Sequence, residues 1–464
     1  MEGLIYKYRS LARITIEAAT PLSICCGDKS IKTDTIINRD VNGLPFIPGT
    51  TIAGLVRHAI KDKEKRNSLM GCQEKDNSEG SRLFFTEAKI LDAHSIPIDG
   101  LIDQSKLDKT NKDFIKNFKV LPIRQHTKIS PKGITVDKGK FDEEIIYKGT
   151  RFCFEMELIS EENEEEELLQ IIDSIYATDF RIGGGSRSGF GKIKVVSAKF
   201  KTLNLSDNKD MNLYLNKSSS LSEENTFYQS FNYESKENTN YISYHLILKP
   251  KDFIFFSSGF GNSKADNTIV KERLISWSNK TKASFIEQNK TILIPASAIK
   301  GAISHRTTFH YNKLKGIYAD EIAPKELQKK VGKYNTAVKE LFGSEGGNGE
   351  NKKRGNVLIA DVLRERNIND KEKVITHVKI DRFTGGAIDG ALFNEETLYA
   401  ENEKIEIEIL VNEEVFKNND GNNIEKAFEQ TLKDICTGRL PLGGGVNKGN
   451  GIFIGELHKN GDKI

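Results

Sequence analysis

The chain has 464 residues, enough for two or three domains of about 100–200 residues each. Its 69 Lys and Arg residues against 66 acidic ones leave a net charge of +3, which excludes a uniformly basic surface. Five cysteines without a Cys-x-x-Cys pair argue against a zinc ribbon and a disulfide framework and predict a protein of the reducing cytoplasm. The absence of any run of 18 apolar residues argues against a membrane-spanning helix and a membrane partner.

The first predicted element is a strand followed by an acidic loop. Arg9 to Leu22 alternates apolar and polar residues, the period-two pattern of a half-buried strand. The loop from Lys32 to Asp40 carries Asp34 and, five residues later, Arg39. A carboxylate there can hold Mg²⁺ or accept a proton from a ribose hydroxyl, the two tasks that RNA cleavage by internal attack needs. By position alone, solvation or the capping of a turn is the more common role of a loop Asp.

A helix is predicted after an Ile-Pro element. Residues Ile47–Gly49 precede Thr50 and Thr51, either of which can cap a helix whose apolar residues recur at helical spacing. His58 follows on this helix, where a packing role explains it about as well as a functional one. Polar residues 61–82 then predict a loop, and Leu83–Phe85 predicts a short strand.

A hairpin is predicted in the middle of this half. His126 and Lys128 lie two residues apart, which places them on one face of a strand, and a Gly-rich stretch separates them from Phe141 and Tyr147. Aromatic residues interleaved with cations suit stacking on bases along a nucleic-acid backbone. A hairpin whose aromatic residues pack inward explains the pattern equally well, and a structural role is the more common one for a histidine at the start of a strand.

The first half closes with a strand, a helix and a glycine cluster. The strand covers Arg151 to Leu158, the helix Glu164 to Ala177, and the cluster Gly183 to Gly191 contains Arg187. Glycine lets the backbone approach a phosphate closely because it lacks a Cβ atom and accepts positive φ. The alternative is a tight turn between the helix and the next strand.

The same landmarks recur in the second half of the chain. The separation from His to Phe is 15 residues in the first copy and 16 in the second, and from Phe to Tyr it is 6 in both. Such spacing indicates an internal duplication, and a cluster with a cation at the same place twice favours a phosphate or RNA contact. The second-copy landmarks are the strand from Tyr241 to Phe256, Asp266, the element Ile294–Gly301 with Ser297 as the helix cap, His377, Phe393, Tyr399 and the cluster Gly443–Gly451 with Lys448.

The duplication predicts two tandem domains of one α+β fold. The order strand, helix, strand, hairpin, strand, helix, glycine loop, strand is typical of a ferredoxin-like unit. We expect a first domain over residues 1–203 and a second over 241–464. Residues 204–240 are rich in Ser, Asn, Asp and Glu and predict a polar linker.

Three motifs together resemble the RAMP superfamily, which forms the backbone of CRISPR effector complexes, and its type III backbone subunits in particular. They are Leu44–Arg57, Ile380–Ala387 and the two terminal glycine loops. The resemblance implies modified RNA-recognition-motif domains that bind guide RNA and whose thumb hairpins, here Gly133–Tyr147 and Gly385–Tyr399, displace a base pair between guide and target. The tandem arrangement resembles the double-backbone subunit of type III-D-like effectors.

The resemblance also implies a function, partners and site residues. Asp34 and its equivalent Asp266 are expected to cleave guide-paired target RNA with Mg²⁺, and the expected partners are guide RNA, target RNA and other effector subunits, including a large signalling or nuclease subunit. Asp34 is the stronger candidate, because 29 residues separate Asp266 from Pro295 against 14 between Asp34 and Pro48, and Ala296 stands where the family has glycine. The expected RNA contacts are Arg39, Arg57, His126, Lys128, Lys132, Phe141, Arg187, His305, Arg306, His377, Lys379, Arg382, Phe383, Phe393 and Lys448.

Two rival functions share this fold. One is a purely structural RNA-binding backbone subunit in which both Asp residues contact solvent. The other is a metal-independent endoribonuclease that processes guide RNA through a histidine such as His58 or His305. The presence of the glycine loop and of the hairpin in both halves argues against the second rival.

Overall fold

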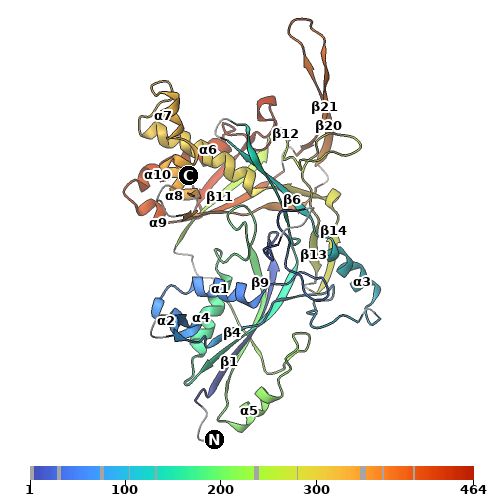
Figure 1. Cartoon of the computed structure of the whole chain (residues 1–464), viewed down its shortest axis with the longest axis vertical. Helices are drawn as coiled ribbons and strands as arrows, with labels where there is room; N and C mark the ends of the chain where they lie inside the picture. The colour runs from blue at the N-terminus through green and yellow to red at the C-terminus, as the bar shows by residue number, and fades with distance from the viewer. Residues whose placement is uncertain are drawn as a thin grey trace.

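Two hydrophobic cores organise the chain, one formed mainly by residues before 200 and the other by residues after 240. The computed structural model describes residues 5–28, 33–73, 78–103, 105–130, 133–234, 240–279, 281–344, 352–367, 370–400 and 403–464. The two parts lie one above the other along the long axis of the molecule (Figure 1). None of the described helices combines the length and the apolar composition that crossing a lipid bilayer requires.

The first half is built on an antiparallel sheet centred on its first strand. β1 (Tyr8–Ala18) pairs on one side with β8 (Arg151–Ser160) and on the other with β9 (Ile193–Asn204). β4 (Leu83–Phe85) extends the sheet beyond β8, and β10 (Gln229–Ser230) extends it beyond β9. Without β10, the strands lie in the order β9, β1, β8 and β4. In chain order these are the fourth, first, third and second strands, which is the ferredoxin-like arrangement.

The second half repeats this sheet. β11 (Tyr241–Pro250) lies between β22 (Ile405–Asn412) and β23 (Phe453–Lys459), and β18 (Val357–Ile359) extends the sheet beyond β22. β24 (Asp462–Lys463) adds the other edge. The predicted α+β fold with two ferredoxin-like domains is therefore confirmed.

Equivalent helices pack against the two sheets. In the first half, α1 (Gly49–Ala59) and α4 (Glu165–Tyr176) contact each other and the sheet, and in the second half α6 (Ala296–Leu314) and α10 (Gly421–Cys436) lie side by side (Figure 1). Each buries the apolar face that its sequence periodicity predicts, as Ile52 and Val56 do on α1. The shorter elements are α2 Lys63–Met70, α3 Lys109–Lys116, α5 Asn208–Leu215, α7 Pro324–Gln328, α8 Thr336–Phe342, α9 Glu414–Lys417, β2 Cys72–Gln73, β3 Ser78–Glu79, β5 Lys89–Ile90, β12 Phe253–Ile254, β15 Thr291–Ile294, β16 Gly343–Ser344, β17 Lys353–Arg354 and β19 Val362–Glu365.

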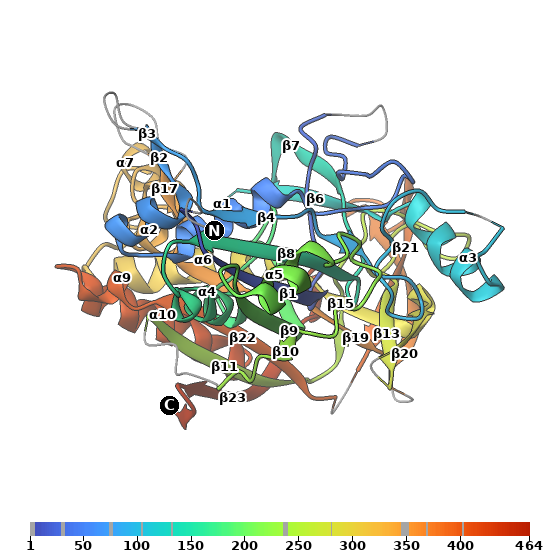
Figure 2. The same ribbon diagram turned by 90° about the horizontal axis from the view of Figure 1, so that it is seen from below.

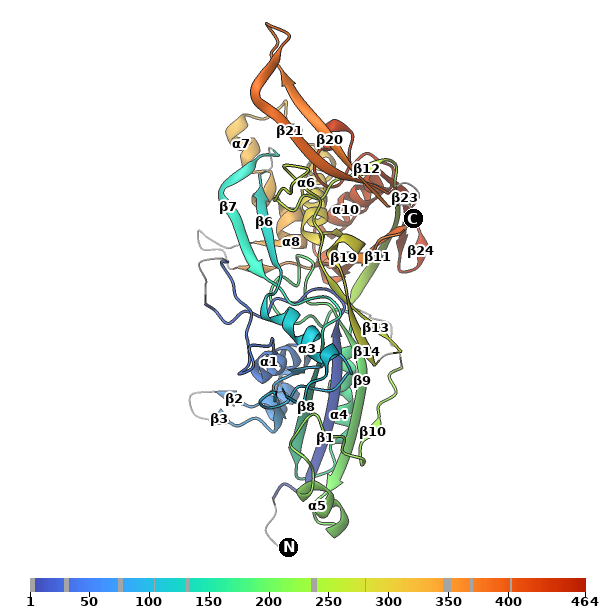
Figure 3. The same ribbon diagram turned by 90° about the vertical axis from the view of Figure 1, so that its right-hand side faces the viewer.

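Each half also projects one long hairpin. β6 (Ile123–Ile129) pairs with β7 (Thr135–Glu144), and β20 (Lys371–Ile380) pairs with β21 (Ala387–Tyr399). The register shifts just after Thr127 in the first hairpin and just after Val378 in the second, which are equivalent positions. Both hairpins point toward the same end of the molecule (Figure 3).

The glycine clusters form the same tight turn in both halves. The amide of Gly184 donates to Ser23 O at 2.7 Å, and the amide of Gly444 donates to Phe255 O at 2.6 Å. Each turn is thereby fastened to the chain that leaves the first strand of its half. Each glycine cluster therefore forms a tight turn, which is one of the two roles that the sequence predicts for it.

The starts of α1 and α6 differ from the prediction. Both helices begin directly after a proline, Pro48 or Pro295, whose fixed φ sends an extended chain into the first turn. At α6, the amide of Ala296 donates to Asp361 Oδ1 at 2.8 Å. A carboxylate distant in the sequence therefore accepts a hydrogen bond from one of the first-turn amides that have no partner within the helix. The predicted caps lie inside the helices and not before them: Thr50, Thr51 and Ser297.

Most of the segment 204–240, predicted as a polar linker, packs against the first sheet. It contains α5 and the strand β10, which pairs with β9. Leu205 and Leu221 are buried, and Arg13 Nη1 donates to Leu221 O at 3.3 Å. These apolar residues are too widely spaced to produce a periodic signal, so the sequence pattern does not reveal their packing.

An insertion of the second half docks onto the first core. β13 (Leu274–Ser278) and β14 (Lys282–Ile286) form a hairpin beside α3 (Figure 2). Phe285 packs 5.3 Å from the ring of Phe114, and Trp277 Nε1 donates to Gly149 O at 2.7 Å. The extra length between Asp266 and Pro295 therefore fastens the two halves together.

A buried ion cluster fastens the base of the first hairpin to the second half. Arg124 on β6 donates through Nε to Glu272 Oε1 at 2.7 Å and through Nη2 to Glu272 Oε2 at 2.6 Å. Its Nη1 donates to Asp361, and its guanidinium lies 4.6 Å from the ring of Phe190. A Cβ atom on Gly189 would lie 2.0 Å from Asp361 Oδ1, so only glycine permits this approach.

Candidate functional site

The acidic loop of each half is fastened to the hairpin of the same half. Asp34 Oδ2 accepts a hydrogen bond from the amide of Asp142 at 3.2 Å, and Asp266 Oδ2 accepts one from the amide of Asn394 at 2.7 Å. Both Asp residues are exposed. The structure therefore places the two predicted catalytic residues at equivalent positions, each at the base of a projecting hairpin.

A histidine, an aromatic ring and a glutamate accompany each Asp. His126 stacks on Phe141 with ring centroids 4.8 Å apart, and His377 stacks on Phe393 at 5.0 Å. We call Asp34, His126, Phe141 and Glu143 the N-site, and Asp266, His377, Phe393 and Glu395 the C-site. Both glutamates recur at the same place in the two copies of the sequence, but they were not predicted as site residues.

The glutamates hold the histidines in these stacks. His126 Nε2 lies 2.8 Å from Glu143 Oε1, within ion-pair distance but without the alignment of a hydrogen bond, and His377 Nε2 lies 2.9 Å from Glu395 Oε2. Ser23 Oγ donates to Glu143 Oε2 at 3.0 Å, which fixes the carboxylate from its other side. The imidazoles are therefore positioned by neighbours from the same hairpin.

The two sites differ in their nearby charges. Lys448 lies 2.9 Å from Glu395 and 4.8 Å from the centre of the Phe393 ring, so the C-site includes a cation from its glycine turn. At the equivalent turn position the first half has Ser188, and Arg187 beside it donates through Nε to Gly355 O in the second half. Each cluster thus contains the predicted cation, but the two cations are offset by one position in the repeat and turn in different directions.

Three other predicted RNA contacts on the loops and helices have protein partners. Arg39 Nη2 donates to Glu144 Oε1 at 2.6 Å and fastens its loop to β7. Arg57 Nη1 donates to Gly71 O at 2.9 Å, and Arg306 Nε donates to the buried Asp434 at 2.6 Å. These guanidinium groups therefore contribute to packing in the free protein, whereas His305 is exposed on α6.

The hairpins expose apolar and basic side chains together. Phe383 at the tip of the second hairpin is 98% exposed, and Phe141 and Phe393 at the bases are 49% and 38% exposed. Exposed apolar side chains in such number on projecting strands indicate a surface that a partner covers. The remaining predicted contacts on the hairpins are Lys128, Lys379 and Arg382, which are exposed, and Lys132, which lies outside the described residues.

Each acidic loop carries an exposed carboxylate, a group that can contribute to the binding of a divalent cation. Among the described residues, no group of three His, Cys, Asp or Glu side chains is arranged to hold a metal ion by itself. Mg²⁺ is usually held by one or two carboxylates together with water and substrate phosphates, and each site supplies an exposed Asp for this mode. The hairpin residue whose amide bonds Asp34 is itself an acid, Asp142, whereas the C-site has Asn394 at the equivalent position.

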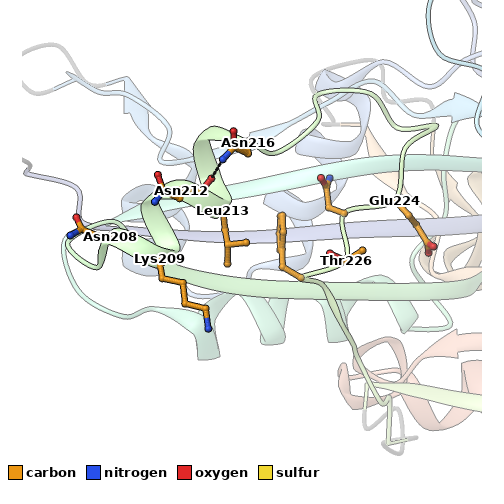
Figure 4. Close-up of a pocket in the computed structure, with 9 residues that line it drawn as sticks. Asn208, Lys209, Asn212, Leu213, Asn216, Glu224 and Thr226 are labelled. Carbon is orange, nitrogen blue, oxygen red and sulfur yellow. Dashed lines mark hydrogen bonds between the residues drawn. The ribbon is translucent and has the colours of Figure 1, made fainter.

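A cavity of about 640 Å³ lies between α5 and residues 224–227 (Figure 4). Amide side chains dominate its lining, including Asn208, Asn212, Asn216 and Asn225. Its lining includes no residue of the acidic loops or the hairpins. The N-site and the C-site, which repeat one arrangement in two domains, are therefore the stronger candidates for function.

The comparison with known families agrees with the duplicated architecture. A family model described as the RAMP superfamily matches residues 15–194 and 278–454, one segment in each half. Each matched segment includes the helix that follows the acidic loop, a hairpin and a glycine turn. The first segment also includes Asp34, whereas Asp266 lies before the start of the second. A search of curated proteins gives no match.

Proposed function

Since the chain belongs to the RAMP superfamily, we propose that it is the guide-RNA-binding backbone subunit of a type III CRISPR effector and that it cleaves guide-paired target RNA at the N-site and the C-site. RAMP proteins bind CRISPR RNA within multi-subunit complexes. The chain is therefore a CRISPR-associated RNA-binding protein, and the cleavage, its metal dependence and the type III assignment are the parts that we propose.

One observation supports cleavage above all: each half carries an exposed carboxylate beside a fixed His–Phe stack at the base of a projecting hairpin. Asp34 and Asp266 are the reactive carboxylates in this proposal. The half-exposed faces of Phe141 and Phe393 offer platforms for an unstacked base. A nucleotide displaced by the hairpin gives its backbone the freedom to reach an in-line geometry.

The proposed reaction is an internal transesterification. The 2′-oxygen of the displaced nucleotide attacks the adjacent phosphorus, the bond from phosphorus to the 5′-oxygen breaks, and the products are a 2′,3′-cyclic phosphate and a 5′-hydroxyl. Asp34 or Asp266 accepts the proton of the 2′-hydroxyl, and solvent returns a proton to the departing 5′-oxygen. When bound, Mg²⁺ would supply positive charge to the reacting phosphate, held by Asp34 with Asp142 in the N-site and by Asp266 in the C-site.

In this proposal the two sites differ in the number of carboxylates, and they should therefore differ in the Mg²⁺ concentration that cleavage requires. The N-site offers Asp34 and Asp142, whereas Asn394 replaces the second acid in the C-site. Two carboxylates attract a divalent cation more strongly than one. We therefore expect half-maximal cleavage at the N-site at a lower Mg²⁺ concentration than at the C-site.

The test uses the assembled complex and a labelled complementary target RNA on a denaturing gel. Asp34→Asn should remove one cleavage product and Asp266→Asn the other, while target binding persists and EDTA removes both products. Asp137→Asn and Asp389→Asn are matched controls, because both acids are exposed on the hairpins away from the two stacks. Products that persist in both site variants would refute the assignment, and a wild-type complex that binds but never cuts would support the purely structural role.

A further inference from the structure

Cations from both halves gather where the glycine turn of the first half meets the second half. Arg187 on that turn donates through Nε to Gly355 O and through Nη1 to Ser186 Oγ at 3.3 Å. Arg354, the residue before Gly355, extends to α1 of the first half, where its Nη1 lies 2.9 Å from His58 Nε2. The chain at β17 thus brings two guanidinium groups to one place.

These cations repel one another in the free protein. Burial, followed by the charge of Arg354, lowers the pKa of Arg187 to about 10. Burial also lowers the pKa of Lys300 on α6, with Arg187 as the second cause. The pKa of His58 is lowered by partial burial, then by Arg354 and by Lys61. Asp179 acts in the opposite direction on His58 and Arg187 but is outweighed, so the positive charges of this cluster exceed the negative charge beside them.

Arg181 provides an independent observation at the same place. This side chain is only 5% exposed, yet its Nε and Nη1 have no hydrogen-bond partner. Asp179 and Glu408 lie near it, but Glu408 is already held by Lys192 Nζ at 2.6 Å. A buried guanidinium with unfilled donors is costly and marks a position that an anion can stabilise.

We infer that Arg181, Arg187, Lys300, Arg354 and His58 form a binding pocket for a backbone phosphate of RNA, assembled from both halves of the chain. The inference rests on the proposed function, because a guide strand that follows both domains must cross this junction. A phosphodiester supplies the missing negative charge and acceptor oxygens, and guanidinium groups bind such oxygens well. The strand then also fixes the two halves relative to each other.

The first test measures the affinity of the full chain for an unstructured single-stranded RNA over a range of salt concentrations. Arg354→Ala should weaken binding several-fold at low salt and reduce the slope of log K against log [salt] by about 0.7, the value expected for one phosphate contact. Lys353→Ala is the matched control, because Lys353 is the exposed neighbour on the same strand and pairs with Glu340. RNA binding with an unchanged slope in Arg354→Ala would overturn the pocket and leave the proposed function intact.

The second test separates a binding role from a structural one. Without RNA, Arg354→Ala should melt at about the same temperature as the wild type, because the loss of the hydrogen bond to His58 is offset by the removal of a repulsion. A clear drop would give Arg354 a structural role instead. Inorganic phosphate should raise the melting temperature of the wild type and not that of the variant. If phosphate stabilises the wild type but Arg354→Ala leaves the RNA affinity unchanged, the pocket binds a small anion and the RNA assignment is overturned. If the wild type does not bind RNA at all, the proposed function is refuted as well.

Discussion

Arg124→Met should strongly destabilise the junction between the two halves. Arg124, Glu272 and Asp361 are all buried, and both acids form ion pairs with the guanidinium of Arg124. Burial favours the neutral form of Arg124, but the two carboxylates outweigh it and raise the pKa of the guanidinium. Methionine fills a similar volume but leaves two buried carboxylates without a cation.

The size of the loss follows from the contacts that are removed. Breaking a buried ion pair from one side costs about 3–5 kcal/mol. Loss of the guanidinium over the Phe190 ring, 4.6 Å away, adds about 1 kcal/mol. We therefore expect the free energy of unfolding to fall by about 4–6 kcal/mol, a large part of the roughly 5–15 kcal/mol that stabilises a typical protein.

Trp277 provides the assay, because it is the single tryptophan and lies at this junction. Its Nε1 donates to Gly149 O at 2.7 Å, and its ring lies 3.9 Å from the guanidinium of Arg151, so its fluorescence reports the separation of the halves in urea. Arg273→Met is the control, since Arg273 pairs with the exposed Glu287 and donates to Asn117 Oδ1 at 2.9 Å, partly exposed contacts whose loss together costs about 1–2 kcal/mol.

A double substitution decides whether the cause is uncompensated charge. Glu272→Met should destabilise the wild type but regain about 2 kcal/mol in the Arg124→Met background, because it removes one of the two unpaired acids. The reasoning fails if the two losses simply add, or if Arg124→Met costs no more than Arg273→Met.

Three further predictions concern pH, thiol chemistry and the hairpin tip. Burial and neighbouring cations lower the pKa of His58 in the folded protein, so as the pH falls the unfolded chain binds a proton at this residue before the folded protein does. The free energy of unfolding should therefore fall as the pH drops below about 6.5. Thermal melts from pH 7 to pH 5 should show a weaker dependence of the melting temperature on pH for His58→Gln than for the wild type, and equal slopes would contradict the prediction. Burial raises the pKa of the Cys153 and Cys436 thiols to about 11, so iodoacetamide at pH 8 should label exposed Cys25 and leave those two until the protein unfolds, as peptide mass spectrometry can verify. Phe383→Ala should change the melting temperature very little, because its side chain is 98% exposed, while it weakens binding of guide-paired target RNA; a large loss of stability would show that the tip packs on the protein.

The sequence by itself determined the repeat and, through it, the fold and the pairing of the two sites. Alternation of apolar residues located β1 and β11, and Leu83–Phe85 was predicted with the bounds that β4 has in the structure. Asp34 and Asp266 were paired by their place in the repeat, and the structure gives both the same hydrogen bond to a hairpin amide. Periodicity and repeated spacing are local properties of a chain, so they can be read without coordinates.

Only the tertiary structure decided how the two halves are joined. The carboxylate of Asp361 satisfies a helix start 65 residues earlier in the chain, and Arg187 turns toward Gly355 in the other half although its cluster repeats with that of Lys448. Arg354 reaches His58 across 296 positions of sequence. Contacts between residues so far apart in the sequence depend on how two folded surfaces pack together, and a local pattern of residues does not predict that packing.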